Sequence, residues 1–411
     1  MRKKQIVIKA DVLFDGLGNK QKNKYIIIED DKIIDIVNEK LTADYGGIVT
    51  PAFIDAHSHI GMAREGEPSS EEEANDTLEQ ICPLNDPLDS IYFDDLAFTE
   101  AVDFGVLYSC VVPGSGNLIG GKAMIIRNYA ENRKNALIKD YGYKMALGFN
   151  PRSTKDWQGK RPNTRMGIYA LLENEFDNVL RKRAKAELSR DQALRELNKK
   201  FTNQKINKRD YKIETLTIDE KYELEFSSKD KAIIDMLSGD KKIKVHVHKE
   251  DDIYYLIKLA QKYGIKVTVD HACDVFHKNI FDDLAGCCIP VVYGPLGSFA
   301  YKVELKHDNY KNTKLLMESQ AFYGLMTDHP VTKASSLRDA LKFFMIQGMK
   351  EEEAISIITY RNAAILGIEE DFGSITNERK ASLIVWDQNP FYLGAFPLLV
   401  MGEGRILRKR I

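Results

Sequence analysis

The chain has 411 residues, of which 44% are hydrophobic and 29% are charged, and its formal net charge is -2. This length suits one large domain or two medium ones, and the near-neutral charge excludes a general attraction to nucleic acid or to anionic membranes. No apolar run approaches the roughly 18 residues that a membrane span needs, and the N-terminal segment lacks a signal-peptide cleavage site. We therefore expect a cytoplasmic protein.

Short β segments stand at both ends of the chain. Near the N-terminus, two strand-like runs flank Asp30-Asp31, which predicts a hairpin turn. The C-terminal segment contains two more runs of the same kind. Because an isolated pair of strands is only marginally stable, we expect residues 1–49 and 376–411 to form one small β-sandwich domain together.

Between these ends, from residue 50 to residue 375, short apolar strands alternate with segments that are apolar at helical spacing. The helical segments include 94–104, 250–264 and 337–348. Strand–helix alternation favours a parallel sheet that is buried on both faces, and eight such strands predict a (β/α)₈ TIM barrel. The eight predicted strands are 47–57, 105–114, 122–127, 143–149, 242–248, 266–272, 289–294 and 322–328.

Residues 181–231 interrupt this alternation. The run that begins "RKRAKAELSRDQALRELNKKF" carries charge around most of its helical surface. This pattern predicts a charged helical insertion that lies in solvent. The alternatives are a lid over the barrel mouth, or a contact between subunits of a homo-oligomer.

Histidines are rare in this chain but gather at predicted strand ends. Only 8 are present in 411 residues. An aspartate, Asp328, stands at the end of the eighth predicted strand. In a barrel of this type, the C-terminal ends of the strands converge on one face, where active sites lie. Five histidines lie at or just before such ends: His57, His59, His246, His248 and His271.

The spacing of these histidines favours a metal site. Side chains alternate along a strand, so His57 and His59 point the same way, as do His246 and His248. Neutral imidazole is the commonest metal ligand in proteins, and a carboxylate completes a mixed nitrogen and oxygen site. An open coordination position would bind water and lower its pKa to about 7, which yields a hydroxide nucleophile.

These motifs resemble those of the amidohydrolase superfamily. "PAFIDAHSH", "KVHVHKEDDI", "VTVDHA" and "GLMTDHP" resemble its first, fifth, sixth and eighth barrel strands, and "ASLIVWDQNP" resembles its closing β-sandwich segment. The resemblance extends over nearly the whole chain. Within the superfamily, the sequence is most similar to the imidazolonepropionase-related amidohydrolases. The resemblance implies a metal-dependent hydrolase that cleaves a C–N bond of a small molecule.

The resemblance also implies a role for each motif residue. His271 would bind a second metal, or lie beside the first and polarise the substrate carbonyl. Asp328 would act as the general base in addition to binding metal. His248 would either support a metal ligand without binding the metal itself or contact the substrate. The implied metal ligands are His57, His59, His246, His271 and Asp328.

The fourth predicted strand leaves the number of metals open. Binuclear members often carry a bridging lysine that is carboxylated by CO₂, and Lys144 stands at the corresponding strand. The alternative is a lysine at the strand start that faces solvent. Phe149 places an apolar ring where related sequences offer a glutamate, which argues against a second ion. We expect one or two divalent ions, zinc first, with Fe, Mn or Ni as alternatives.

Substrate contacts are predicted from residues that follow the fourth and seventh strands. Arg152 and Arg165 could bind a carboxylate in bidentate fashion, with surface-loop charges as the alternative. Tyr293 could donate a hydrogen bond to the scissile carbonyl, with simple packing as the alternative. We assign no role to Lys302 or Glu304.

Two other functions are open to this sequence. A mononuclear deaminase of the same fold would use the same ligands, with His271 polarising the substrate. A non-catalytic scaffold would be expected to have lost ligands, whereas all five are present here. The leading hypothesis is an amidohydrolase that acts on a cyclic or linear amide.

Overall fold

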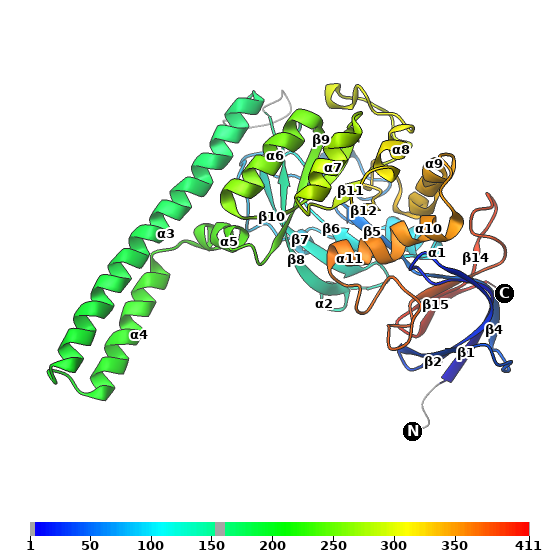
Figure 1. Cartoon of the computed structure of the whole chain (residues 1–411), viewed down its shortest axis with the longest axis horizontal. Helices are drawn as coiled ribbons and strands as arrows, with labels where there is room; N and C mark the ends of the chain where they lie inside the picture. Colours follow the sequence, from blue (N-terminus) through cyan, green and yellow to red (C-terminus); the bar gives the residue numbers. More distant parts are fainter. Residues whose placement is uncertain (1–4, 153–160, 411) are drawn as a thin grey trace.

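The computed structural model describes residues 5–152 and 161–410. It contains a barrel surrounded by helices, a curved sheet built from both ends of the chain, and a long pair of helices at one side (Figure 1). In the two described ranges, no helix is both long enough and apolar enough to cross a membrane.

The barrel contains all eight strands predicted from the sequence. They follow one another in chain order across the sheet, and the last strand lies beside the first, so the barrel nearly closes. This arrangement confirms the TIM-barrel prediction. The strands are β5 (Phe53–Ser58), β6 (Val106–Val111), β7 (Ile119–Arg127), β8 (Leu137–Ala146), β9 (Lys242–Lys249), β10 (Lys266–Asp274), β11 (Val291–Tyr293) and β12 (Tyr323–Leu325).

One strand departs from the predicted parallel sheet. β7 runs antiparallel to both of its neighbours, β6 and β8, whereas the other adjacent pairs are parallel. Parallel neighbours need a crossover connection of about a dozen residues or more. The link 112–118 between β6 and β7 is too short for such a crossover, so β7 returns beside β6 in the opposite direction.

Helices pack on the outside of the barrel. In α6, Ile253, Leu256, Ile257 and Ala260 form the buried stripe, and Gly264 ends the helix at a φ of 67°, which glycine adopts without steric penalty. The predicted helix 337–348 divides into a 3₁₀ segment and α9. The α-helices of the barrel are α1 (Leu96–Asp103), α2 (Arg133–Ala136), α6 (Glu250–Tyr263), α7 (Lys278–Gly286), α8 (Asn312–Met317), α9 (Lys342–Met345), α10 (Glu351–Ser356) and α11 (Asn362–Leu366). Short 3₁₀ segments span Ser69–Glu71, Pro87–Asp89, Val303–Leu305 and Ala334–Leu341, and a π-helical turn spans Ile357–Arg361.

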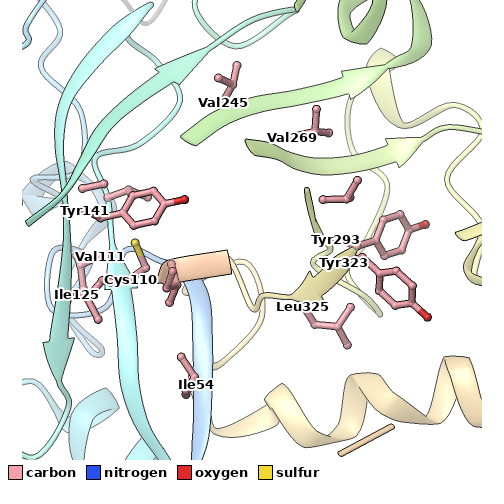
Figure 2. Packing of buried hydrophobic residues seen from close by; sticks show 14 of the residues in the cluster. Ile54, Cys110, Val111, Ile125, Tyr141, Val245, Val269, Tyr293, Tyr323 and Leu325 are labelled. Carbon is pink, nitrogen blue, oxygen red and sulfur yellow. The ribbon is translucent and has the colours of Figure 1, made fainter. Parts of the chain in front are cut away.

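The barrel strands carry a continuous apolar core. Ile54, Val245, Val269 and Leu325 come from four different strands and are completely buried (Figure 2). Truncating a buried leucine such as Leu325 to alanine costs about 2–5 kcal/mol. This packing fixes the strands, and therefore the positions of the side chains at their ends.

The two ends of the chain form one seven-stranded sheet. Its order is β15-β14-β13-β4-β1-β2-β3, so the C-terminal strand β13 pairs directly with the N-terminal strand β4. Glu29 pairs with Lys32 across the predicted turn at Asp30-Asp31, and this confirms the hairpin. The strands are β1 (Gln5–Phe14), β2 (Lys20–Glu29), β3 (Lys32–Val37), β4 (Tyr45–Pro51), β13 (Leu383–Trp386), β14 (Pro397–Gly402) and β15 (Arg405–Lys409).

Between β8 and β9, the described residues form three helices: α3 (Arg165–Thr202), α4 (Lys208–Leu224) and α5 (Ser228–Leu237). The first half of α3 contains four buried residues, Ile168, Leu172, Phe176 and Val179, whereas α4 has no buried residue. We call α4 and the second half of α3 the helical hairpin. α3 begins after the C-terminal end of β8, and the hairpin projects away from the barrel before α5 returns to the start of β9 (Figure 1). The hairpin therefore does not cover the strand ends as a lid would.

Candidate metal centre and active site

The predicted histidines and aspartate meet at the C-terminal ends of four strands. β5 and the residue after it carry His57 and His59, β9 carries His246 and His248, β10 carries His271, and Asp328 follows β12. All six side chains are buried. We use the name ligand cluster for His57, His59, His246, His271 and Asp328.

Hydrogen bonds determine which ring nitrogen faces the middle of the ligand cluster in three of these histidines. His57 Nδ1 lies 2.6 Å from Asp270 Oδ2, His59 Nδ1 lies 2.7 Å from the Val112 carbonyl oxygen, and His271 Nδ1 lies 3.0 Å from the Gly294 carbonyl oxygen. Each acceptor requires a proton on Nδ1, so Nε2 keeps its lone pair. Such outer contacts orient the rings of metal-binding histidines and set their tautomer.

The free nitrogens converge on one another and on Asp328. His57 Nε2 lies 3.4 Å and His59 Nε2 3.1 Å from Asp328 Oδ1. His246 Nδ1 lies 2.6 Å from His271 Nε2. Ligand atoms of His57, His271 and Asp328 lie within 4.8 Å of one another, as do those of His246, His248 and His271. These distances are short enough for shared metal ions.

The electrostatics of the cluster favour neutral rings at His57, His246 and His271. Burial, together with nearby cations, lowers the pKa of His57 to about 3 and the pKa values of His246 and His271 well below the ordinary value. Burial alone would raise the pKa of Asp328, but His59, His57 and Lys144 hold it below its usual range. Neutral imidazoles and an ionised carboxylate are the protonation states that bind a divalent cation.

Lys144 is buried on β8, so the solvent-facing alternative for this lysine is wrong. Its side chain is 1% exposed, and Nζ has no hydrogen-bond partner among the described residues. Burial lowers its pKa to about 8. Buried polar atoms ordinarily have partners. His57 Nε2 and His248 Nδ1, at the same strand ends, also have no hydrogen-bond partner among the described residues. These buried polar atoms are available to bind an additional group.

The predicted substrate contacts are placed less simply. Arg165 Nη1 lies 2.7 Å from Asp252 Oδ1 at the start of α3. The Arg152 guanidinium lies 4.5 Å from the centre of the Phe149 ring. Tyr293 is buried and packs edge-on against Phe281 of α7. None of these contacts involves the ligand cluster.

The structure adds charged residues to which the sequence analysis assigned no role. Lys244 Nζ lies 2.9 Å from Asp270 Oδ2, and both side chains are completely buried beneath His57. Lys302 and Glu304 enter from the loop after β11, where Glu304 Oε1 lies 3.6 Å from His246 Nε2. The strand alternation in "KIKVHVH" could have revealed Lys244, because it shares a face with His246. No sequence pattern of this kind indicated Lys302 or Glu304 in the loop.

Comparisons with known proteins find similar proteins among the amidohydrolases. The model of the amidohydrolase family matches residues 198–407, which is just over half of the chain. The amidohydrolase tasK of Hapsidospora irregularis is 25% identical over 414 residues, which cover 96% of this chain and 39% of that protein. The chain therefore spans about two fifths of the length of this curated relative.

Solved structures show the same fold. An amidohydrolase from Thermotoga maritima MSB8 has a TM-score of 0.84 and 26% sequence identity, with 98% of this chain and 100% of that chain covered. A prolidase in complex with N-methylphosphonate-L-proline has a TM-score of 0.60 and 12% identity, with 99% and 100% covered. At 12% identity, the likeness to the prolidase concerns the fold alone.

Proposed function

Because the chain belongs to the amidohydrolase family, we propose that it is a metal-dependent hydrolase that cleaves the C–N bond of a cyclic or linear amide. The observation that carries this proposal is the convergence of the ligand cluster at one end of the barrel, with free nitrogens and an ionised carboxylate facing one another. A scaffold that lacks activity would have no need for these buried, mutually oriented groups.

The residues present fit a divalent metal. His57, His59 and Asp328 would hold one ion, and His246 and His271 a second. Imidazole and carboxylate ligands suit zinc, with Fe, Mn and Ni as alternatives. A bound divalent ion supplies a water of lowered pKa and polarises a carbonyl oxygen.

Lys144 supports two ions if it is carboxylated. Its neutral amine would attack CO₂, an N–C bond would form, and the amine proton would leave to solvent, which yields an anionic carbamate. This change would turn a buried amine into an anionic oxygen ligand for divalent ions. The burial of Lys144 and its lack of a partner support this assignment.

The side chains would then divide the remaining work. Asp328 accepts the proton of the attacking water and delivers it to the leaving nitrogen as the C–N bond breaks. His248 reaches the same space from β9 and contacts the substrate. The roles of Arg152, Arg165 and Tyr293 toward the substrate stay predictions, as does the assignment to the imidazolonepropionase-related branch.

The test combines metal analysis with a substrate screen. Purified protein should contain one or two divalent ions per chain, and a chelator should abolish turnover that zinc, manganese or nickel restores. The screen covers N-acyl amino acids, dipeptides that include Xaa-Pro, lactams and imidazolones, and detects new primary or secondary amine and ammonia separately. Release of ammonia alone would favour the deaminase, and full activity without metal would overturn the proposal.

A further inference from the structure

Glu304 lies on a loop that turns its charges inward. The loop between β11 and α8 exposes Tyr301 and Val303, which are 62% and 73% accessible. The side chains of Lys302 and Glu304, which alternate with them, are only 6% and 3% accessible. A loop that buries charged residues and exposes apolar ones is organised around a polar partner beneath it, since burial of unpaired charge is costly.

The carboxylate of Glu304 is held from two sides. Oε2 accepts a hydrogen bond from the Phe149 backbone N–H at 2.8 Å. Oε1 lies 2.8 Å from Lys302 Nζ, 3.6 Å from His246 Nε2 and 3.9 Å from His248 Nε2. Burial alone would raise the pKa of Glu304, but His248, Lys302 and the Phe149 amide hold it below its ordinary value. Lys302 is thus the counter-ion of a buried carboxylate that faces two histidines.

The positions of the ring protons follow from the partners along one chain of contacts. His271 Nδ1 faces the Gly294 carbonyl, which only accepts, so its Nε2 carries a lone pair. The contact of 2.6 Å to His246 Nδ1 therefore places a proton on that nitrogen. His246 Nε2 is then bare and faces Asn150 Nδ2 at 3.3 Å. Lys302 Nζ, 3.2 Å from Asn150 Oδ1, holds the amide in this orientation.

Metal binding at His246 Nδ1 requires the other tautomer. Nδ1 must then offer its lone pair, so the ring proton must lie on Nε2. The Asn150 amide nitrogen cannot accept that proton, because it is a donor only. Glu304 Oε1, at 3.6 Å, is a carboxylate acceptor that a small side-chain adjustment brings within hydrogen-bond distance.

We propose that Glu304 is a positioning residue that accepts the Nε2 proton of His246 whenever His246 presents Nδ1 to a metal ion, with Lys302 as its counter-ion. The inference rests on the metal site of the proposed function. It makes the loop between β11 and α8 part of the metal centre, although neither Lys302 nor Glu304 is a ligand.

The first measurement is the zinc affinity of the full-length protein, obtained by competition with a chromogenic chelator. Glu304→Ala should weaken zinc binding about 10- to 100-fold, the range seen when an outer partner of a metal ligand is lost. Glu304→Gln should lose less zinc affinity, because its amide oxygen still accepts a hydrogen bond from His246 Nε2. The matched control is Glu250→Ala, which removes a carboxylate 3.0 Å from His277 Nδ1, outside the ligand cluster, and should leave zinc affinity unchanged.

The second measurement reads the tautomer directly. In wild-type protein with ¹⁵N-labelled histidine, zinc should move the His246 proton from Nδ1 to Nε2 in long-range ¹H–¹⁵N spectra. His246→Gln identifies the signal. If wild-type protein bound no zinc, the proposed function itself would fail. If wild-type protein bound zinc but retained the Nδ1 proton, or if Glu304→Ala bound zinc as tightly, the role of Glu304 alone would be overturned. Should Glu304→Ala not fold, the wild-type spectra and Glu304→Gln still decide.

Discussion

The barrel interior and the helical hairpin are both rich in charge, yet they place charge in opposite environments. In the hairpin, Arg190 Nη2 and Asp219 Oδ1 lie 2.8 Å apart, with side chains 39% and 41% exposed. In the barrel, Lys244 and Asp270 lie at nearly the same separation and are completely buried. Exposed pairs contribute about 0–1 kcal/mol, whereas loss of one partner of a buried pair leaves an uncompensated charge. The comparison indicates that an interior pair, unlike an exposed one, cannot lose one partner without a large loss of stability.

The largest expected effect is on stability, from Lys244→Met. Removal of this ammonium leaves the Asp270 carboxylate buried with no cation beside it. We expect the free energy of unfolding to fall by about 3–5 kcal/mol, measured by urea denaturation of metal-free protein. Lys244→Met combined with Asp270→Asn should recover part of the loss. The matched control is Lys200→Met in the hairpin, where Lys200 Nζ lies 3.8 Å from Glu214 and both side chains are half-exposed. Equal losses at the two positions would contradict the expected difference between buried and exposed ion pairs.

The next effect is on catalysis, from Asp328→Asn. The amide keeps the shape of the side chain but cannot take the proton of the attacking water. We expect kcat to fall by at least about 10²-fold, the low end for loss of a general base, once the screen supplies a substrate. Asp219→Asn in the hairpin makes the same chemical change in solvent and should leave kcat unchanged. A wild-type kcat in Asp328→Asn would remove the residue from its proposed role.

A third effect is the response of the metal-free protein to acid. Burial lowers the pKa of His57 and of His248 to about 3, against about 6.5 for an unfolded histidine. Between these values the unfolded state binds more protons than the folded state, so stability rises with pH and is lost as pH falls from about 6.5 toward 3. The denaturation midpoint should decrease as the pH is lowered through this window, and His57→Gln should make that decrease less steep. A constant midpoint from pH 7 to pH 4 would contradict neutral buried imidazoles.

The smallest expected effect sharpens the other side of the comparison. Arg190→Ala removes the exposed hairpin pair with Asp219, and the free energy of unfolding should change by less than about 1 kcal/mol. Metal content and kcat should not change, because the hairpin projects away from the barrel that carries the ligand cluster (Figure 1). The measurement is the same urea titration at low and high salt. A substantial loss of metal in this variant would show that the hairpin supports the centre.

The sequence predicted the parts of the molecule that depend on periodicity. Apolar runs located all eight barrel strands, and alternation placed His57 with His59 and His246 with His248. The direction of β7 was not predicted, because it depends on the length of a link and not on a pattern within the strand. The cytoplasmic location and the homo-oligomer alternative stay predictions.

The outer contacts of the centre were harder to predict. Lys244 and Asp270 carry a local signal, since each is a charged residue inside an apolar strand. Lys302 and Glu304 carry none, because a loop of this composition reads as surface until its path across the barrel mouth is known. Lys144 was ambiguous for a related reason: a strand-start lysine can face either side, and only the register with Lys244 on β9 shows that it points inward.

The pairing of β4 with β13 has a consequence for synthesis. Strand β4 is hydrogen-bonded to a strand that the ribosome makes only after the entire barrel, residues 52–382. At ~10 residues per second, roughly half a minute passes between the two strands. During that time the N-terminal strands present an open edge, the kind of template that pairs with other chains. A nascent or C-terminally truncated chain is therefore prone to aggregate through its N-terminal strands, although the strands that it lacks are the C-terminal ones.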